Sequence, residues 1–144
     1  MKNYQSHTLL SLLFWICCPA LLHATMEHPV SIEKLKVEYA EIPLGIDVEK
    51  PRFSWQMVMQ NTERGYSQKA YQITVTDETG QTVWDSGRVS SDLSLNIEYA
   101  GAPLQPTTCY FWTVNVWNQK GEQSSSTSWF ETGLMSKANP YEGW

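Results

Sequence analysis

The sequence predicts an all-β protein, a sandwich of about seven antiparallel strands in two sheets. Short segments alternate apolar and polar residues with a period of two, which is typical of half-buried strands. Clusters of Gly, Pro, Asp and Ser separate these segments at short intervals. No segment after residue 24 has the 3.6-residue period of an amphipathic helix. We expect the sandwich to cover residues 25–135, with a closed barrel as the alternative fold.

The strongest alternation occurs in the stretch 104–117, LQPTTCYFWTVNVW. Its apolar face consists of Tyr110, Trp112, Val114 and Val116, which we expect to be buried. The spacing Leu104-x-Pro106-x-Thr108-x-Tyr110 precedes this face. A Tyr at such a position can bury its ring and bond its hydroxyl to the backbone of the preceding turn. That arrangement is the tyrosine corner of immunoglobulin-like sandwiches, so the stretch favours a sandwich over a barrel.

The remaining strands are predicted from shorter runs, and the residues between them from turn composition. The runs are Leu35, Val37 and Tyr39; Phe53, Trp55 and Met57; Tyr71, Ile73 and Val75; residues 83–87; Leu93, Leu95, Ile97 and Tyr99; and residues 129–133. We expect a polar lead at residues 25–32, a loop at 61–68 and a turn at 77–80.

Residues 1–24 have the pattern of an export signal. Lys2 gives a positive start, an apolar run extends from Leu9 to Leu22, and Ala24 supplies a small residue for cleavage. The run is short for a membrane span, and Pro19 interrupts it. We therefore expect an exported, periplasmic or extracellular protein. Lipid attachment at Cys17 or Cys18 remains an open alternative.

Composition excludes several classes of function. The formal net charge is −5 and no basic patch occurs, so nucleic acid is not an expected partner. Beyond the export signal only Cys109 remains, so no intrachain disulfide is expected. His28 is then the single histidine, which leaves neither a catalytic triad nor a metal site. No Gly-rich phosphate loop is present. We expect no cofactor and no metal.

The carboxylates do not predict a catalytic pair. A glycosidase needs two carboxyl groups that face each other across a bound sugar. Here most carboxylates fall in turns or on polar strand faces, which indicates solvated surface charge. They are Asp47, Glu49, Asp77, Glu78, Asp85, Asp92, Glu98, Glu122 and Glu131. The sequence therefore predicts no catalytic residues.

Aromatic residues that are expected to point outward are the candidate contact site. They are Trp84, Phe111, Trp117 and Trp129. Indole rings can stack on the apolar faces of sugars, which would make a carbohydrate-binding platform. Outward aromatics also form docking surfaces between domains. We favour an interdomain contact and keep sugar binding as the alternative.

An ordered set of motifs resembles the opening of bacterial alpha-L-rhamnosidases. The motifs are Tyr39-x3-Pro43-Leu44-Gly45-Ile46-Asp47-x3-Pro51-Arg52-Phe53-Ser54-Trp55; Ala70-Tyr71-Gln72-Ile73-x-Val75; Trp84-Asp85-Ser86-Gly87-x-Val89; Tyr99-Ala100-Gly101-x-Pro103-Leu104; Tyr110-x-Trp112-x-Val114-x-Val116-Trp117; and Phe130-x2-Gly133-Leu134. The resemblance implies an N-terminal fibronectin-type-III-like sandwich, which precedes further β domains and an (α/α)6 catalytic barrel. That family hydrolyses terminal alpha-L-rhamnose with inversion, and it uses acidic residues of the barrel that have no counterpart here.

These observations lead to one functional expectation. The chain is expected to be a non-catalytic module of an exported alpha-L-rhamnosidase-like glycoside hydrolase, truncated before the barrel, with residues 136–144 as a linker toward an absent domain. Its partners would be the downstream domains and, through the parent enzyme, rhamnose-containing glycans. The alternative is a carbohydrate-binding or surface-adhesion module that uses the outward aromatics.

Overall fold

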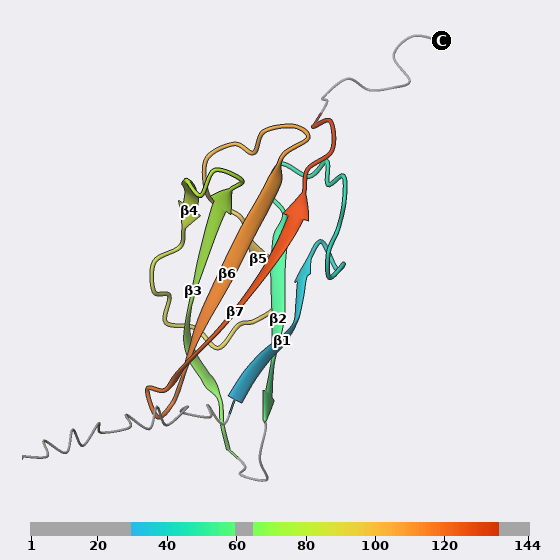
Figure 1. Cartoon of the computed structure of the whole chain (residues 1–144). Coiled ribbons are helices and arrows are strands. Elements are labelled where there is room, and N and C mark those ends of the chain that lie inside the picture. The colour runs from blue at the N-terminus through green and yellow to red at the C-terminus, as the bar shows by residue number, and fades with distance from the viewer. Residues whose placement is uncertain (1–29, 60–64, 136–144) are drawn as a thin grey trace, which may run out of the picture.

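The computed structural model describes residues 30–59 and 65–135, which fold into two packed antiparallel sheets without a helix (Figure 1). The strands are β1 (Val30–Val37), β2 (Arg52–Met59), β3 (Gln68–Asp77), β4 (Thr82–Asp85), β5 (Ile97–Glu98), β6 (Cys109–Asn118) and β7 (Gln123–Glu131). The predicted all-β, immunoglobulin-like sandwich is therefore confirmed.

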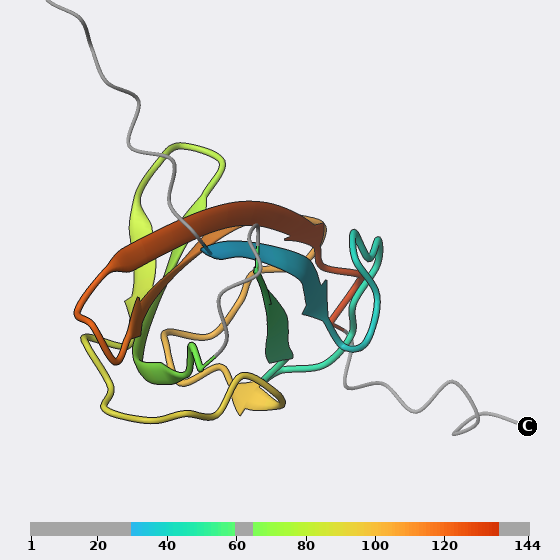
Figure 2. The ribbon, with the colours of Figure 1, turned by 90° about the horizontal axis from the view of Figure 1, so that it is seen from below.

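The two sheets have the strand orders β1-β2-β5 and β4-β3-β6-β7. Figure 2 shows them as two layers, with β1 lying next to β7 at one side. There the Ser124 hydroxyl donates a 2.7 Å hydrogen bond to the Val30 carbonyl. The chain moves repeatedly from one sheet to the other, so each sheet contains strands that are distant in sequence.

Strands β3 and β6 form the centre of the larger sheet, and their register explains the core. Ile73 pairs with Val114, and Val75 pairs with Trp112. Partners in such a pair project to the same face. The predicted buried face of β6 is confirmed, because Tyr110, Trp112, Val114 and Val116 are each at most 2% exposed.

Aromatic rings join the two sheets across the interior. Phe53 of β2 lies 4.8 Å from the Trp112 ring and 6.0 Å from the Phe130 ring, centroid to centroid. Tyr110 stacks on Phe130 at 5.5 Å. Aromatic pairs of this kind stabilise by about 0.5–1.5 kcal/mol beyond the burial of their area. Large side chains therefore occupy the space between the sheets.

A buried amide connects the core to the long segment between β4 and β5. The Trp55 indole N–H donates to the Gln68 Oε1 atom at 3.0 Å, and Gln68 is only 5% exposed. The Gln68 amide nitrogen in turn donates to the carbonyls of Ser91 and Leu93, at 3.1 and 2.6 Å. One side chain thus gives the buried Trp55 indole an acceptor and holds two carbonyls of the loop.

The tyrosine corner is present. The Tyr110 hydroxyl accepts a 2.8 Å hydrogen bond from the backbone N–H of Gln105, and the Tyr110 ring is 2% exposed. The bond connects the start of β6 to the turn that precedes it. The spacing that begins at Leu104 therefore predicted both the ring burial and the backbone bond.

The first strand differs from its prediction at both ends. It begins at Val30, and Val30 and Ile32 are buried where a polar lead over residues 25–32 was expected. Tyr39 is not in the strand and is 61% exposed. Glu38 and Tyr39 have positive φ angles of 48° and 72° and form a tight turn that pairs Val37 with Ala40.

The alternating run at residues 93–99 forms only the short strand β5. Leu93 and Leu95 are 61% and 63% exposed, so the expectation of a full strand there is wrong. One backbone bond to β2 persists in this run, because the Ser94 carbonyl accepts from the Trp55 N–H at 2.9 Å. Asn96 then has a φ of 57°, which is incompatible with a continuous strand. Gln68, expected in a loop, begins β3.

The two central tryptophans provide a matched test of the buried amide. Trp55→Phe should lower the free energy of unfolding by about 1–2 kcal/mol more than Trp112→Phe, because it leaves the Gln68 oxygen buried without a donor. The Trp112 indole nitrogen has no hydrogen-bond partner among the described residues, so its loss removes no bond. Urea titration of both variants measures the difference. Equal losses, or the reverse order, would contradict the assigned bond.

Tyr110→Phe tests the tyrosine corner. It should cost about 1–2 kcal/mol of unfolding free energy, because the Gln105 N–H loses its acceptor. Tyr39→Phe is the control, since this exposed hydroxyl should change stability by less than about 0.5 kcal/mol. Thermal melting of both variants makes the comparison. A Tyr110→Phe variant that melts with the wild type would show that the corner does not stabilise the fold.

Candidate functional site

Three of the four predicted contact residues lie on the outer face of the larger sheet. Phe111 and Trp117 belong to β6 and alternate with its buried residues, and Trp129 belongs to β7. Phe111 and Trp129 are register partners, so their side chains stand next to each other on one face. Phe111 is 43% exposed.

Trp84 does not share this surface. It pairs with the buried Val75, so its side chain points into the sandwich. Its ring stacks on Phe53 at 5.9 Å and meets the edge of Tyr99 at 5.1 Å. The expectation that Trp84 faces outward is therefore wrong, because this half-buried ring covers the margin of the core.

Polar residues separate Trp117 from the Phe111–Trp129 pair. The hydroxyls of Thr113 and Thr127 lie 2.9 Å apart on the rungs between them. The amide of Gln123, the register partner of Trp117, donates to the Asn115 Oδ1 atom at 3.0 Å. Trp117 itself lies under the Arg88 guanidinium, 4.4 Å from the ring centroid. The outer face is thus mostly a hydrogen-bonded polar surface with aromatic residues at its two ends.

A corner of three chain segments surrounds the end of β7. Thr132 is 1% exposed, and its hydroxyl donates to the Gln105 carbonyl at 2.7 Å and accepts from the Thr108 N–H at 3.0 Å. The Gly133 N–H donates to the Ile46 carbonyl at 2.8 Å. Ile46 and Thr132 form a parallel bridge, so the β1–β2 connection extends the larger sheet at this point.

Asp47 closes the same corner. Its Oδ1 atom accepts a 2.8 Å hydrogen bond from the Met135 N–H. A Cβ atom at Gly133 would overlap the Asp47 carboxylate, so a larger residue there would displace the carboxylate from its present position. The backbone just beyond β7 is therefore held by side-chain and backbone bonds to segments far away in sequence.

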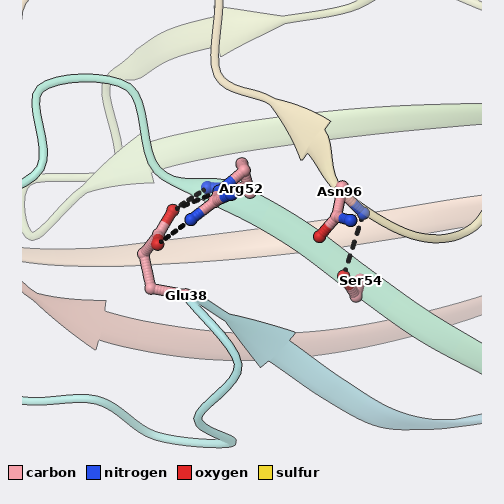
Figure 3. A network of polar contacts seen from close by, with 4 residues as sticks. All are labelled: Glu38, Arg52, Ser54 and Asn96. Atoms are coloured by element: carbon pink, nitrogen blue, oxygen red, sulfur yellow. Dashed lines mark hydrogen bonds and ion pairs between the residues drawn. The ribbon is translucent and has the colours of Figure 1, made fainter.

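A second polar network fixes the turn after β1 (Figure 3). Glu38 accepts from the Arg52 backbone N–H at 2.8 Å and from the Arg52 guanidinium at 3.1 and 2.8 Å. Nearby, the Asn96 N–H donates to the Ser54 hydroxyl at 3.1 Å. The hydrogen bonds from Arg52 hold the pKa of Glu38 below its ordinary value. This pairing secures a turn whose two non-glycine residues have positive φ.

Two further carboxylates, Asp77 and Asp85, also have structural partners. Asp77 accepts from the N–H groups of Thr79 and Gln81 and closes the turn between β3 and β4. Asp85 accepts from the Gln72 amide at 2.8 Å. Burial raises the pKa of the Cys109 thiol, so this group is protonated near neutral pH and is a poor nucleophile.

No group of three or more His, Cys, Asp or Glu residues with metal-binding geometry occurs within residues 30–59 and 65–135. The same part of the chain contains no helix with the length and apolar character of a membrane span. The expected export signal, the lipid sites at Cys17 and Cys18, His28 and the expected linker at 136–144 lie outside the described residues.

Sequence reasoning missed the residues of the corner and of the turn. Thr132 and Glu38 have no distinguishing pattern in the sequence, because their partners are 24 and 14 residues away. Gly133 belongs to the motif Phe130-x2-Gly133-Leu134, but its contact with Asp47 depends on how the chain folds.

The Glu38–Arg52 pair gives a pH prediction. Because the Glu38 pKa is lowered by folding, its stabilisation is complete above the ordinary Glu value of about 4.3 and disappears as the pH falls below it. Glu38→Gln should therefore cost about 1 kcal/mol at pH 7, and this difference should shrink at pH 3. Glu41→Gln is the control, since its pair with Lys34 is exposed on both sides. Urea titration at both pH values measures the effect; a pH-independent Glu38→Gln difference would contradict the pairing.

Known proteins resemble this chain over the sandwich. An alpha-L-rhamnosidase of Streptomyces avermitilis is 48% identical over 105 residues, which are 69% of this chain and 10% of that protein. The chain spans 10% to 15% of the length of the curated alpha-L-rhamnosidases that it matches.

Solved structures agree with the sequence comparison. The Streptomyces avermitilis alpha-L-rhamnosidase complexed with L-rhamnose superposes with a TM-score of 0.68 and 45% identity, over 74% of this chain and 11% of that chain. The alpha-L-rhamnosidase from Dictyoglumus thermophilum gives a TM-score of 0.66 and 40% identity, over 74% and 13%. The family described as Rha78A-like, N-terminal immunoglobulin domain matches residues 32–136. Because this match covers almost all of the described sandwich, the chain belongs to the family of Rha78A-like N-terminal immunoglobulin domains.

Proposed function

We propose that this chain is the non-catalytic N-terminal module of an exported alpha-L-rhamnosidase-like glycoside hydrolase, in which it braces the neighbouring domains. The observation that carries the proposal is the extent of the match. An alpha-L-rhamnosidase is 48% identical to this chain over 105 residues, which make up only 10% of that protein, and the family of N-terminal immunoglobulin domains matches residues 32–136. The remaining part of such a parent protein would contain the catalytic site.

The chemistry of the surface pockets supports a role without catalysis. One pocket, of 360 Å³, contains a single carboxylate, Glu49, next to Lys50. Another, of 210 Å³, is lined by Lys34 and Lys36 and has no carboxylate. Hydrolysis of a glycosidic bond needs two carboxyl groups at a fixed separation across the sugar. Neither pocket supplies them.

The proposal includes the organisation and the location of the parent protein. Residues 1–24 direct export, residues 25–135 form the module, and residues 136–144 lead toward the next domain. The parent hydrolyses terminal alpha-L-rhamnose with inversion in a separate catalytic domain, in the periplasm or outside the cell. Mass spectrometry of the secreted chain tests the first part, with a mature N-terminus at Thr25 as the expected result.

Two measurements test the function. The purified chain should not hydrolyse an aryl alpha-L-rhamnoside above a mock-purified control, because neither pocket formed by the described residues contains two carboxyl groups. In a chimera, residues 30–135 should replace the matching region of the Streptomyces avermitilis enzyme and keep it folded and active. Hydrolysis that copurifies with the chain at constant specific activity, or a chimera that aggregates like an enzyme without its module, would refute the proposal.

The Phe111–Trp129 pair supports carbohydrate binding as a second candidate function. An exposed Phe beside a Trp offers apolar surface for one sugar ring, although polar residues separate this pair from Trp117. Titration with rhamnose-containing glycans, followed by Trp fluorescence, tests this function. A saturable change that Trp129→Ala abolishes and Trp117→Ala retains would support it, and no change at millimolar glycan would exclude it.

A further inference from the structure

We propose that one end of the sandwich, where β7 leaves the fold, is the docking surface for the domain that follows in the parent protein. We call this end the exit surface. It consists of the exposed residues Ile42, Leu44, Val48 and Leu134 together with a pocket lined by Glu49, Lys50, Tyr99, Gly101, Pro103, Leu104, Pro106 and Met135. The inference rests on the proposed function and names the interface through which the module would act.

Exposed apolar side chains are concentrated at this end. Leu134 is 71% exposed, Leu44 68%, Ile42 54% and Val48 42%. Single exposed apolar residues are common on protein surfaces, but several in one place mark a contact surface. Figure 1 shows that the β1–β2 connection, the segment before β6 and the end of β7 all lie at this end of the sandwich. The segments that carry these exposed apolar residues and line the pocket therefore lie together at one end of the sandwich.

Backbone bonds hold these segments side by side. The Glu131 N–H donates to the Pro43 carbonyl at 3.0 Å, next to Ile42 and Leu44. The hydrogen bond from the Met135 N–H to the Asp47 carboxylate likewise joins the direct chain neighbours of Leu134 and Val48. The apolar side chains are thus displayed on a fixed framework, so little conformational entropy would be lost when they are covered.

The pocket gives the exit surface a concave centre. Its volume of 360 Å³ is lined largely by apolar side chains, among them Leu104 and Met135. Tyr99 is fixed there, because its hydroxyl donates to the Ala102 carbonyl at 2.7 Å. A rigid apolar hollow beside exposed leucines fits a protruding apolar side chain of a partner domain.

The following domain is the occupant that this position favours. In the proposed parent, that domain is joined to the module by residues 136–144, which reach at most about 30 Å from Met135 when fully extended. A short tether gives the two domains a millimolar effective concentration, so even a modest apolar contact is populated. The lengths of the curated relatives, of which this chain covers 10% to 15%, leave ample sequence for such a domain.

Leu93 and Leu95 provide a matched control. They are 61% and 63% exposed, which is close to the values for Leu44 and Leu134. They belong to the segment between β4 and β5, and Leu95 lines the pocket that contains Lys34 and Trp55. A general loss of surface apolarity would affect both pairs, whereas loss of the docking contact would affect only the exit surface.

The experiment uses the chimera described above and the full 144-residue chain. The double variant Leu44→Ser/Leu134→Ser should increase proteolytic cleavage between the module and the next domain roughly tenfold, which corresponds to about 1.4 kcal/mol of lost docking free energy. The variant Leu93→Ser/Leu95→Ser should leave the cleavage rate unchanged. In the isolated chain, both double variants should melt with the wild type, which shows that folding is intact. If the double variant melts at a lower temperature than the wild type, the single variant Leu134→Ser replaces it in the cleavage assay.

The outcomes separate the two proposals. A wild-type chimera that is inactive or aggregated counts against the proposed function. An active wild-type chimera in which the exit-surface variant is cleaved at the wild-type rate overturns the docking surface while the function stands. Faster cleavage of the Leu93/Leu95 variant, with no effect at Leu44 and Leu134, would place the contact elsewhere and would also overturn the inference.

Discussion

The contact of large rings between the two sheets is the interaction on which the rest of the structure depends. Phe53 of β2 meets Trp112 of β6 at 4.8 Å, although the two strands belong to different sheets and share no ladder hydrogen bonds. Burial of such rings supplies the main driving force for joining the layers. Because side chains fill the interior, any interaction with another molecule has to occur at the surface.

Hydrogen bonds at the end of β7 complete the sandwich. Thr132, Gly133 and Asp47 tie residues 132–135 to two other segments, so the backbone just beyond the last strand is held in place. The same bonds hold the apolar residues of the exit surface in place. Stability and the proposed docking are therefore linked, because the bonds that complete the fold also shape the surface that a following domain would meet.

The sequence predicted the central strands well and the edges less well. Residues 70–76 and 110–117 alternate clearly because both strands lie inside the larger sheet and bury one whole face. The run from Leu93 alternates too, but the Leu93 carbonyl bonds to the Gln68 side chain and the positive φ of Asn96 interrupts the extended backbone, and no local pattern reveals this. In the four-residue strand β4, alternation was too short to give the face of Trp84. The corner at the end of β7 could not be predicted, since the segments that form it are distant in sequence.

A double-mutant cycle between Phe53→Leu and Trp112→Leu tests most directly whether rings hold the sheets together. The unfolding free energies of the wild type, both single variants and the double variant would be measured by urea titration. Contact across the sheets predicts a coupling of about 0.5–1.5 kcal/mol between the two substitutions. Losses that add within about 0.3 kcal/mol would show that the two rings do not interact, and would contradict the account.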